Sequence, residues 1–351
     1  MSEATKKSTW HLDEFQVAED KHDYSLADEK ITIANYKAKL KITVVSCKDN
    51  DLEFDMIGIH SSVANAFRRL MLSHVPSMAI EKVFLYKNTS ILQDEVLAHR
   101  MGLLPLKANP YLFQYKDKDS DDLGTELDTL EFELKVKCTR KKDVKNTQNP
   151  DIAYENSNVF SGQMKWLPRG KQAQIFKEAD VAAIYDNIVV TKLRPGQEVD
   201  LRCVAVKGVG IDHAKFSPVA TTYYRLMPEI RITRPVKGKD ACLLQQCFSP
   251  GVIGINEDDE AYVKDVRHDT LSRNVYRYPH LAEAVSISRV RDHFIFTVES
   301  IGALKPDVIF IEAVKMLRNK CIKFMKLVLC PIILKISMSY IASVWRNSEI
   351  E

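Results

Sequence analysis

The sequence lacks the paired cysteines of a zinc-binding or disulfide-linked domain. It contains seven cysteines, an odd number, and none of them forms a CxxC motif. Cysteines scattered in this way are typical of buried thiols in a reducing compartment. The N-terminal region also lacks the apolar run of a signal peptide, so we expect a protein that is not secreted.

A large net charge is absent as well. The 50 lysines and arginines nearly balance the 47 aspartates and glutamates, which leaves a net charge of +3. This charge is too small for a chain that binds nucleic acid by electrostatic attraction alone. With 45% hydrophobic and 28% charged residues, the 351-residue chain has the composition of a soluble globular protein of about two domains.

Residues arranged for catalysis are also missing. His213 lies between Asp212 and Ser217, but neither a nucleophile elbow nor an oxyanion-hole motif accompanies it. We interpret His213 as a structural histidine in a turn. The GVG motif at Gly208 and Gly210 has no third glycine and no helix after it, which favours a plain turn over a phosphate site.

Metal ligands at a suitable spacing are not found either. Cys242 and Cys247 could offer two ligands, but no second pair accompanies them. The acidic loop that begins at Asp117 resembles the start of a calcium loop, yet Asp122 occupies the position that requires glycine. We therefore predict no metal, no cofactor and no catalytic residue.

A strong helical pattern begins at Ser61. Ser61 is placed to cap a helix that continues to His74 and ends before Pro76. Apolar residues recur at three- and four-residue steps and give the helix one apolar stripe. The stripe includes Val63, Ala66, Phe67, Leu70 and Met71. Arg68 and Arg69 lie off the stripe, where a guanidinium can reach a neighbouring carboxylate or carbonyl.

A strand and a second short helix follow. The run Ala79–Tyr86 alternates apolar and polar residues imperfectly and predicts a strand. Asp94 is placed to cap a helix over Glu95–Met101, and Gly102 suits the left-handed position after its end. The whole stretch carries no group set up for chemistry, so we interpret it as a packing unit.

Most of the remaining chain predicts strands. Residues 78–219 read as a β-rich section with long polar loops, including a basic run that starts at Arg140. We interpret that run as a solvated loop. Residues 1–29 are polar and predict a flexible or partner-ordered arm. Strands are expected over Tyr36–Cys47, Leu52–Ile59, Leu130–Cys138, Val199–Lys207 and Val290–Ser300.

The longest helical pattern begins at Pro306. Proline at the first position and Asp307 after it are typical of a helix start. Apolar residues then alternate four- and three-residue steps, as in a seam that packs on a partner helix. They are Phe310, Val314, Leu317, Cys321, Phe324 and Val328. The same seam could equally cover the protein's own sheet.

The tail from Phe324 to Trp345 is apolar and about as long as a membrane span. Lys326 and Lys335 lie inside it, and each costs about 3 kcal/mol near the centre of a bilayer. Pro331 would also break a helix there. These residues disfavour a span, although a membrane-tethered protein stays open as an alternative.

Five sequence words carry a family resemblance. NAFRRLML, VPSMAIEKV and QDEVLAHRMGLLPL stand in order within residues 65–106, and HAKFSPVATTYYRL and RDHFIFTVESIGALKPDVIFIEAV follow later. Together they resemble the alpha-like subunits of DNA-dependent RNA polymerases, the family of bacterial alpha and archaeal D. They resemble in particular the larger alpha-like subunit shared by eukaryotic polymerases I and III. The resemblance covers about residues 30–325 and fades past Phe324, where that subunit usually stops soon after.

The resemblance implies an α+β fold of the alpha-subunit N-terminal-domain type. In that fold both ends of the chain form a dimerisation domain, and a β-rich domain is inserted between them. Carried over, the dimerisation domain comprises 30–77 and 220–345, the inserted domain is 78–219, and 1–29 is the arm.

The resemblance also implies a non-catalytic assembly function. The chain would pair with a smaller alpha-like subunit and form a platform for the two largest subunits and small assembly subunits of polymerases I and III. It would act in the nucleus, in nucleolus and nucleoplasm, contact DNA only indirectly and contact no membrane. The implied heterodimer interface is Phe67, Leu70, Met71, Phe310, Val314, Leu317 and Cys321. The implied contact with the second-largest subunit is Arg68, Arg69, His99 and Arg100.

Besides the membrane-tethered alternative, two other interpretations remain. The equivalent subunit of polymerase II carries a cysteine cluster for zinc in its inserted domain, whereas Cys138 and Cys203 stand alone here. That difference favours the subunit of polymerases I and III. An independent nucleic-acid-binding module that uses the run at Arg140 is the second alternative.

Overall fold

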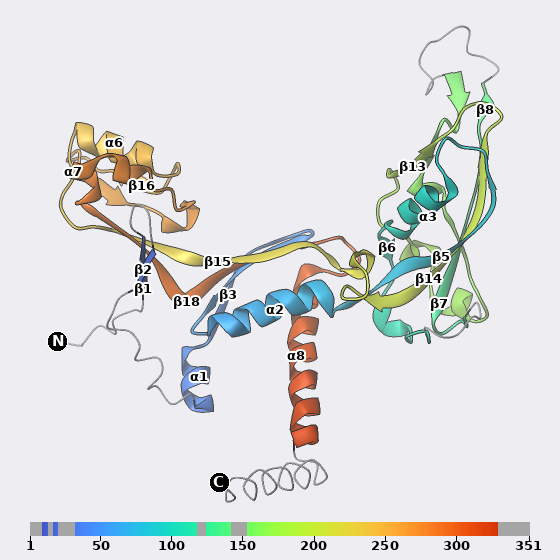
Figure 1. Cartoon of the computed structure of the whole chain (residues 1–351), viewed down its shortest axis with the longest axis horizontal. Coiled ribbons are helices and arrows are strands. Elements are labelled where there is room, and N and C mark those ends of the chain that lie inside the picture. The colour runs from blue at the N-terminus through green and yellow to red at the C-terminus, as the bar shows by residue number, and fades with distance from the viewer. Residues whose placement is uncertain (1–8, 13–16, 20–31, 118–123, 142–152, 329–351) are drawn as a thin grey trace, which may run out of the picture. The chain divides into compact units, whose positions relative to one another are not determined.

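The computed structural model describes residues 9–12, 17–19, 32–117, 124–141 and 153–328 (Figure 1). The chain divides into two compact units. Unit 1 comprises Met1–Asn65 and Tyr223–Val298, and unit 2 comprises Ala66–Thr222 and Glu299–Glu351. The predicted dimerisation domain, 30–77 with 220–345, takes segments from both units, and its boundaries stay a prediction.

Unit 1 is built on an antiparallel sheet with the strand order β2-β1-β18-β4-β3, and β15 pairs with β18. Stacked rings of Phe54 and Phe296, with centroids 5.1 Å apart, form part of its core, and Tyr224 lies edge-on to Phe294. The strands are β1 (Thr9–Leu12), β2 (Val17–Glu19), β3 (Lys41–Lys48), β4 (Asp51–Ile57), β15 (Val219–Ile232) and β18 (Val285–Ser300).

A smaller layer of unit 1 lies between β15 and β18 in the sequence. Its core gathers apolar residues such as Leu244, Val275 and Ile287, all almost fully buried. Its elements are α6 (Lys239–Cys247), β16 (Ile253–Ile255), β17 (Ala261–Val263), η6 (Val266–His268), η7 (Asn274–Arg277) and α7 (Pro279–Ala282), and the short helix α1 (Ile33–Lys39) precedes β3.

Unit 2 contains a four-stranded antiparallel sheet with the order β11-β7-β14-β5. The long strands β5 (Pro76–Asn88), β7 (Thr129–Lys137) and β14 (Glu198–Val209) run through it, and β11 (Lys165–Leu167) forms one edge. Helix α3 (Asp94–Gly102) buries Leu97 and Met101 in the core of this unit. The alternation of β7, with Leu130, Phe132 and Leu134 buried, explains how a period of two forms this core.

Shorter elements complete unit 2. They are β6 (Leu106–Lys107), η2 (Pro110–Leu112), β8 (Thr139–Arg140), β9 (Tyr154–Glu155), β10 (Asn158–Phe160), η3 (Ser161–Gln163), α5 (Gln172–Ile175), η4 (Glu178–Asp180), β12 (Ala182–Ala183), β13 (Val189–Lys192) and η5 (Ala214–Phe216).

Two long helices carry the segments expected to pair with a partner. Helix α2 (Ser61–Ser73) joins the two units in sequence, and α8 (Pro306–Val328) begins after β18. Both start where the sequence predicts. The predicted membrane-like tail, apart from its first residues, lies outside the described residues, as do most of the acidic loop after Asp117 and the basic run after Lys141.

Most predicted elements are confirmed as β4, β5, β7, β14, β18, α2, α3 and α8. The strand expected over Tyr36–Cys47 is wrong in its first part, because α1 occupies the chain up to Lys39 and β3 starts at Lys41. Alternating lysines suit an exposed helix as well as a strand, and Thr32 caps α1 by accepting from the amide of Asn35 at 3.2 Å. Within the expected arm, the structure places β1 and β2.

Three local details also differ from expectation. Ser61 does not cap α2. His60 takes this role instead. Its backbone carbonyl accepts from the amide of Ala64, and the Nδ1 atom of its imidazole accepts from the amide of Ser62. Gly102 is the last residue of α3 rather than a left-handed residue beyond it. Asp94 is likewise inside α3, where its carboxylate accepts from the Asn88 side chain at 2.8 Å.

Candidate assembly surface

Helices α2 and α8 meet inside unit 2. The rings of Phe67 and Phe310 pack edge to face with centroids 5.6 Å apart. Such an aromatic pair contributes about 0.5–1.5 kcal/mol beyond the apolar area that it buries. Helix α8 buries Ile309 and Ala313 in the same part of its length. The first half of α8 is therefore anchored to its own chain.

A hydrogen-bonded chain links the end of α2 to the middle of α8. The ammonium group of Lys320 lies 2.7 Å from Nε2 of His74, and Nδ1 of His74 lies 2.7 Å from Oγ of Ser73. Burial, followed by the charges of Lys320 and Arg69, lowers the pKa of His74. A neutral imidazole can accept from Lys320, so a lowered pKa preserves the link.

Beyond Lys320 the described part of α8 has no buried residue. From Cys321 to Val328 every side chain is exposed, including Phe324 at 65%, Met325 at 62% and Val328 at 66%. Within unit 2, Figure 1 shows no other described helix or strand beside this last third of α8. Exposed aromatic and aliphatic side chains grouped on one helix mark an interaction surface.

The structure divides the predicted heterodimer residues into three groups. Leu70 and Met71 are buried within the chain, and Phe67, Phe310 and Leu317 are half-buried. Val314 and Cys321 are exposed. The exposed group can meet a partner directly, whereas the buried pair can only support the helix from inside.

Sequence reasoning missed several exposed apolar residues on α8. Ile311, Ile322 and Met325 are exposed at 49%, 38% and 62%. They lie outside the heptad seam, and a sequence pattern gives no sign that α8 leaves its own chain halfway along. The high apolar content of the second half of α8 was the available signal.

The four residues predicted to contact a large subunit differ in their surroundings. Arg69 is exposed and has no ion pair with any described residue, whereas Arg68 is half-buried and already engaged. Arg100 donates from Nε to the carbonyl of Val190 at 2.9 Å and from a terminal nitrogen to Val189 at 2.6 Å. Arg100 therefore ties α3 to β13, and Arg69 is the more available cation.

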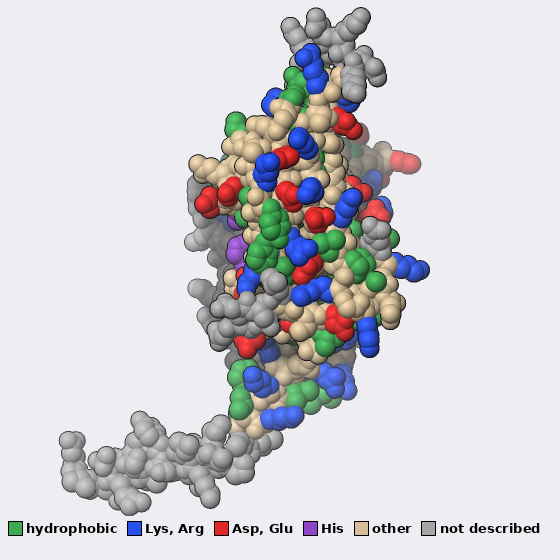
Figure 2. All heavy atoms as spheres, turned by 90° about the vertical axis from the view of Figure 1, so that its right-hand side faces the viewer, with side chains coloured by type: hydrophobic (Ala, Val, Ile, Leu, Met, Phe, Trp, Pro, Cys, Tyr) green, Lys and Arg blue, Asp and Glu red, His purple; other side chains and the backbone are tan. Residues whose placement is uncertain are grey.

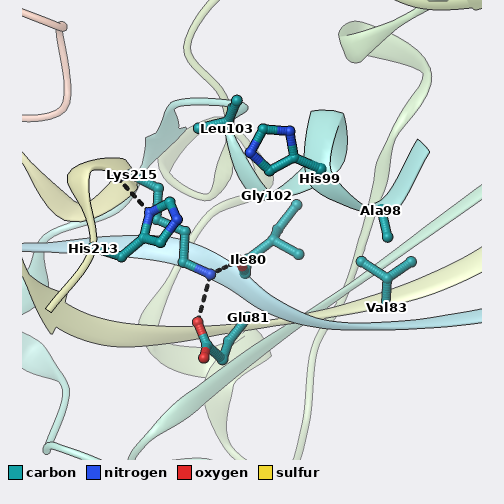
Figure 3. Close-up of a pocket in the computed structure, with 9 residues that line it drawn as sticks. All are labelled: Ile80, Glu81, Val83, Ala98, His99, Gly102, Leu103, His213 and Lys215. Carbon is teal, nitrogen blue, oxygen red and sulfur yellow. Dashed lines mark hydrogen bonds and ion pairs between the residues drawn. The ribbon is translucent and has the colours of Figure 1, made fainter. Parts of the chain in front are cut away.

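His99 lines a pocket of about 260 Å³ between β5, α3 and η5 (Figure 3). Lys215 closes its floor, because its ammonium donates to the carbonyl of Ile80 at 2.9 Å and pairs with Glu81 at 2.5 Å. Nδ1 of His213 accepts from the amide of Lys215 at 3.1 Å. The polar groups of the pocket largely satisfy one another and leave no arrangement for acid–base chemistry.

The loop around η2 is fastened to α8 and to the sheet. The hydroxyl of Tyr111 bonds Glu312 of α8, and burial, followed by that bond, raises the pKa of Tyr111. The Lys207 ammonium donates to the carbonyl of Phe113 at 3.0 Å and lies over the ring of Tyr115, 4.7 Å from its centroid. The loop thus holds the start of α8 in place on unit 2. No sequence motif signalled these contacts.

The motifs that could suggest chemistry have structural tasks. A Cβ at Gly208 would lie 2.6 Å from the ring of Phe216, and one at Gly210 would lie 2.2 Å from the carbonyl oxygen of Leu72. The two glycines thus allow close packing. Burial raises the pKa of the Cys203 thiol to about 12 and also raises that of Cys138. Among the described residues no three histidine, cysteine or acidic side chains gather as a metal site.

Two further alternatives can be compared with the surface. On the face of unit 2 in Figure 2, basic and acidic side chains are interspersed, and no continuous basic stripe crosses it. Arg140 is exposed in β8, at the edge of the described chain. No helix of the described part is long and apolar enough to cross a membrane.

Comparison with known proteins finds the same family that the sequence motifs resemble. Residues 53–321 match the RNA polymerase Rpb3/Rpb11 dimerisation domain. The DNA-directed RNA polymerases I and III subunit RPAC1 of Mus musculus is 48% identical over 86% of this chain and 88% of its own length. RPAC1 of Saccharomyces cerevisiae is 46% identical over 84% and 89%, and DNA-directed RNA polymerase II subunit rpb3 of Dictyostelium discoideum is 31% identical over 82% and 95%.

The matched region covers most of the chain and contains both helices of the assembly surface up to Cys321. Identity to the polymerase I and III relatives exceeds identity to the polymerase II relative across a similar span. The resemblance read from the sequence words is therefore confirmed, as is the α+β fold. This chain belongs to the Rpb3/Rpb11 family of alpha-like RNA polymerase subunits, in the branch of the larger subunit shared by polymerases I and III.

Proposed function

We propose that this protein is a non-catalytic assembly subunit of RNA polymerases I and III. It pairs with a smaller alpha-like subunit and provides a platform for the two largest subunits and for small assembly subunits. It acts in the nucleus, in both nucleolus and nucleoplasm, where these enzymes make ribosomal, transfer and 5S RNA. The exposed apolar half of α8, inside a family of dimerisation domains, carries this proposal.

The α8 surface fits a helical partner. Val314 and Cys321 belong to one heptad seam, and Phe324 and Val328 extend it. Phe67 and Phe310 pack α2 against α8, so that two helices can be presented together. Leu70, Met71 and Leu317 support this pair from within or from its margin.

Co-expression with the smaller alpha-like subunit tests the pairing. Val314→Asp combined with Cys321→Asp places two charges in the proposed contact, and removal of such a contact weakens binding by about tenfold or more. A matched control is Ile91→Asp with Ile175→Asp, because both isoleucines are exposed in unit 2 and neither belongs to α8. The α8 variant should lose co-purification, and the control should keep it.

The folded state of both variants is checked by circular dichroism and thermal unfolding. These positions are exposed, so both variants should unfold near the wild-type temperature. A wild-type chain that is soluble and monomeric beside the smaller subunit, or an α8 variant that pairs normally, would refute the assembly proposal.

Contact with the second-largest subunit is a second part of the proposal. Arg69 is exposed, and His99 lies at the rim of the pocket in Figure 3. Arg68 is already engaged, and Arg100 ties α3 to β13. Arg69→Glu in the preformed heterodimer should reduce capture of the second-largest subunit by about tenfold, whereas Arg140→Glu should not. Equal losses for both variants would show a general effect of charge.

A further inference from the structure

Strand β3 is an open edge of the unit 1 sheet. It pairs with β4 on one side, and within the described chain no strand pairs with its other side. Almost every residue from Lys41 to Lys48 is exposed, which means that both faces of the strand are uncovered. Ile42, Val44 and Val45 are exposed at 48%, 61% and 49%. Another chain can therefore reach both the backbone hydrogen-bonding groups at the edge of β3 and the side chains on its two faces.

The middle of β3 has little protection against pairing. Between Lys41 and Lys48 the sequence ITVVSC contains no charge and no proline. Exposed edge strands usually carry such residues, because an apolar edge otherwise pairs with another chain. The irregular register between Val44 and Ser46 is the one protective feature, and it twists the edge without covering it.

The hairpin geometry shows which groups point outward. Lys48 pairs with Asp51 across a two-residue turn, in which Asp49 has a φ of 47°. The pair that closes such a turn is hydrogen-bonded, so the next pair, Cys47 with Leu52, is not. The backbone amide and carbonyl of Cys47 therefore face the open edge. The thiol of Cys47 is exposed, so its chemical labelling can report whether this edge is covered.

Charge indicates what fits this edge. From Ile33 to Lys48, through α1 and β3, the chain has four lysines and no acidic residue. An extended segment with acidic side chains would match them. Nucleic acid fits less well, because the open edge of a strand binds another extended polypeptide through main-chain hydrogen bonds. A second copy of β3 would bring like charges together.

We propose that β3 accepts an extended acidic segment of another polymerase subunit, which joins the unit 1 sheet as an added strand. The proposal rests on the assembly function and gives the chain an interface separate from α8. Main-chain hydrogen bonds to the open edge would supply affinity, and the flanking lysines would select the acidic segment.

The exposed cysteines provide the test. Cys47 reports on β3, Cys321 on α8, and Cys242 on α6. Each is followed by maleimide labelling and peptide mapping in the isolated chain, the heterodimer and the complete polymerase. We expect Cys47 labelling to slow by about tenfold or more in the heterodimer or in the polymerase, while Cys242 serves as the internal reference. Cys321 should be protected already in the heterodimer.

The outcomes separate the two proposals. Unchanged Cys321 labelling in the heterodimer would refute the α8 pairing, whatever happens at Cys47. Cys47 labelling that stays unchanged in every assembly would overturn the β3 proposal and leave the α8 pairing intact. Protection of Cys47 by rising concentration of the isolated chain, or by an added 20-nucleotide DNA, would also overturn it in favour of self-pairing or nucleic acid.

Two further measurements distinguish a strand added to β3 from a partner that covers Cys47 without pairing with the strand. Amide exchange of the peptide containing β3 should slow in the same assembly, because an added strand bonds its outward amides. Lys41→Glu with Lys48→Glu should restore Cys47 labelling to within about twofold of the isolated chain. Lys165→Glu, at an exposed lysine of the edge strand β11, is the matched control and should leave Cys47 labelling unchanged. Unchanged exchange, or no effect of the lysine variant, would refute the acidic strand.

Discussion

At the scale of single residues, Arg267 shows how one side chain joins distant parts of unit 1. Its guanidinium donates to Asp55 at 2.8 Å and to Glu53 at 2.6 Å, both on β4. His293 brings Nε2 within 3.2 Å of Asp55, without hydrogen-bond geometry. Arg267 therefore supplies the principal charge that compensates the buried carboxylate of Asp55.

Arg267→Ala should destabilise the protein by about 3 kcal/mol, because it leaves the charge of Asp55 buried without its partner. The exposed pair of Arg234 and Glu283 provides the control, and Arg234→Ala should cost less than about 1 kcal/mol. Urea unfolding measures both. Equal costs would show that the Arg267 cluster behaves as an ordinary surface pair.

His74 gives a dependence of stability on pH. Its pKa in the folded protein is lowered from 6.5, so the unfolded chain binds more protons in the interval below pH 6.5. The contribution of His74 to stability is therefore present above pH 6.5 and is lost as the pH falls through that interval. His74→Gln should reduce the difference in melting temperature between pH 7.5 and pH 5.5. An unchanged or larger difference in the His74 variant would contradict this role.

At the scale of elements, side-chain contacts join η2 to the first half of α8. Tyr111 of η2 and Glu312 of α8 are hydrogen-bonded, and Lys315 pairs with Glu312 at 2.7 Å one turn further on. Lys207 holds the same loop on β14. The first half of α8 is thus fixed from two sides, by Phe67 and by this loop, while the second half projects.

Tyr111→Phe removes the hydroxyl and leaves the ring in place. We expect amide exchange to become faster in η2 and in the first turns of α8, since the bond to Glu312 is lost at a cost of about 1–2 kcal/mol. The matched control is Tyr115→Phe, which keeps the bond between Tyr111 and Glu312. Faster exchange in both variants alike would refute the specific role of Tyr111.

At the scale of the whole molecule, two separate hydrophobic clusters can be compared among the described residues, one in each unit. Leu134 belongs to the core of unit 2, and Ile287 belongs to the smaller-layer core of unit 1. Both side chains are almost fully buried. Units with separate cores can open separately, in which case unfolding is not a single two-state step.

Leu134→Ala and Ile287→Ala should each remove about 2–4 kcal/mol. Native-state amide exchange followed by mass spectrometry should show the loss in unit 2 for the first variant and in unit 1 for the second. Each variant serves as the control for the other. Uniform loss across both units for either variant would show that the chain unfolds as one cooperative unit.

The sequence alone determined much of the local structure, because turns, caps and periodicity act within a few residues. The period of two defined β7 and β14, and proline followed by aspartate marked the start of α8. The five sequence motifs shared with the alpha-like subunits determined the fold class. Where local patterns suit two structures equally, as in the lysine-rich segment of α1, the prediction of a strand was wrong.

Only the tertiary structure decided which apolar residues remain available. Leu70 and Val314 follow the same helical spacing, yet Leu70 is buried and Val314 is exposed. Burial depends on contacts between segments far apart in the sequence, such as Tyr111 with Glu312, and no short pattern encodes them. The sequence thus determined that α2 and α8 are amphipathic, and packing within the chain decided which part of α8 remains exposed for a partner.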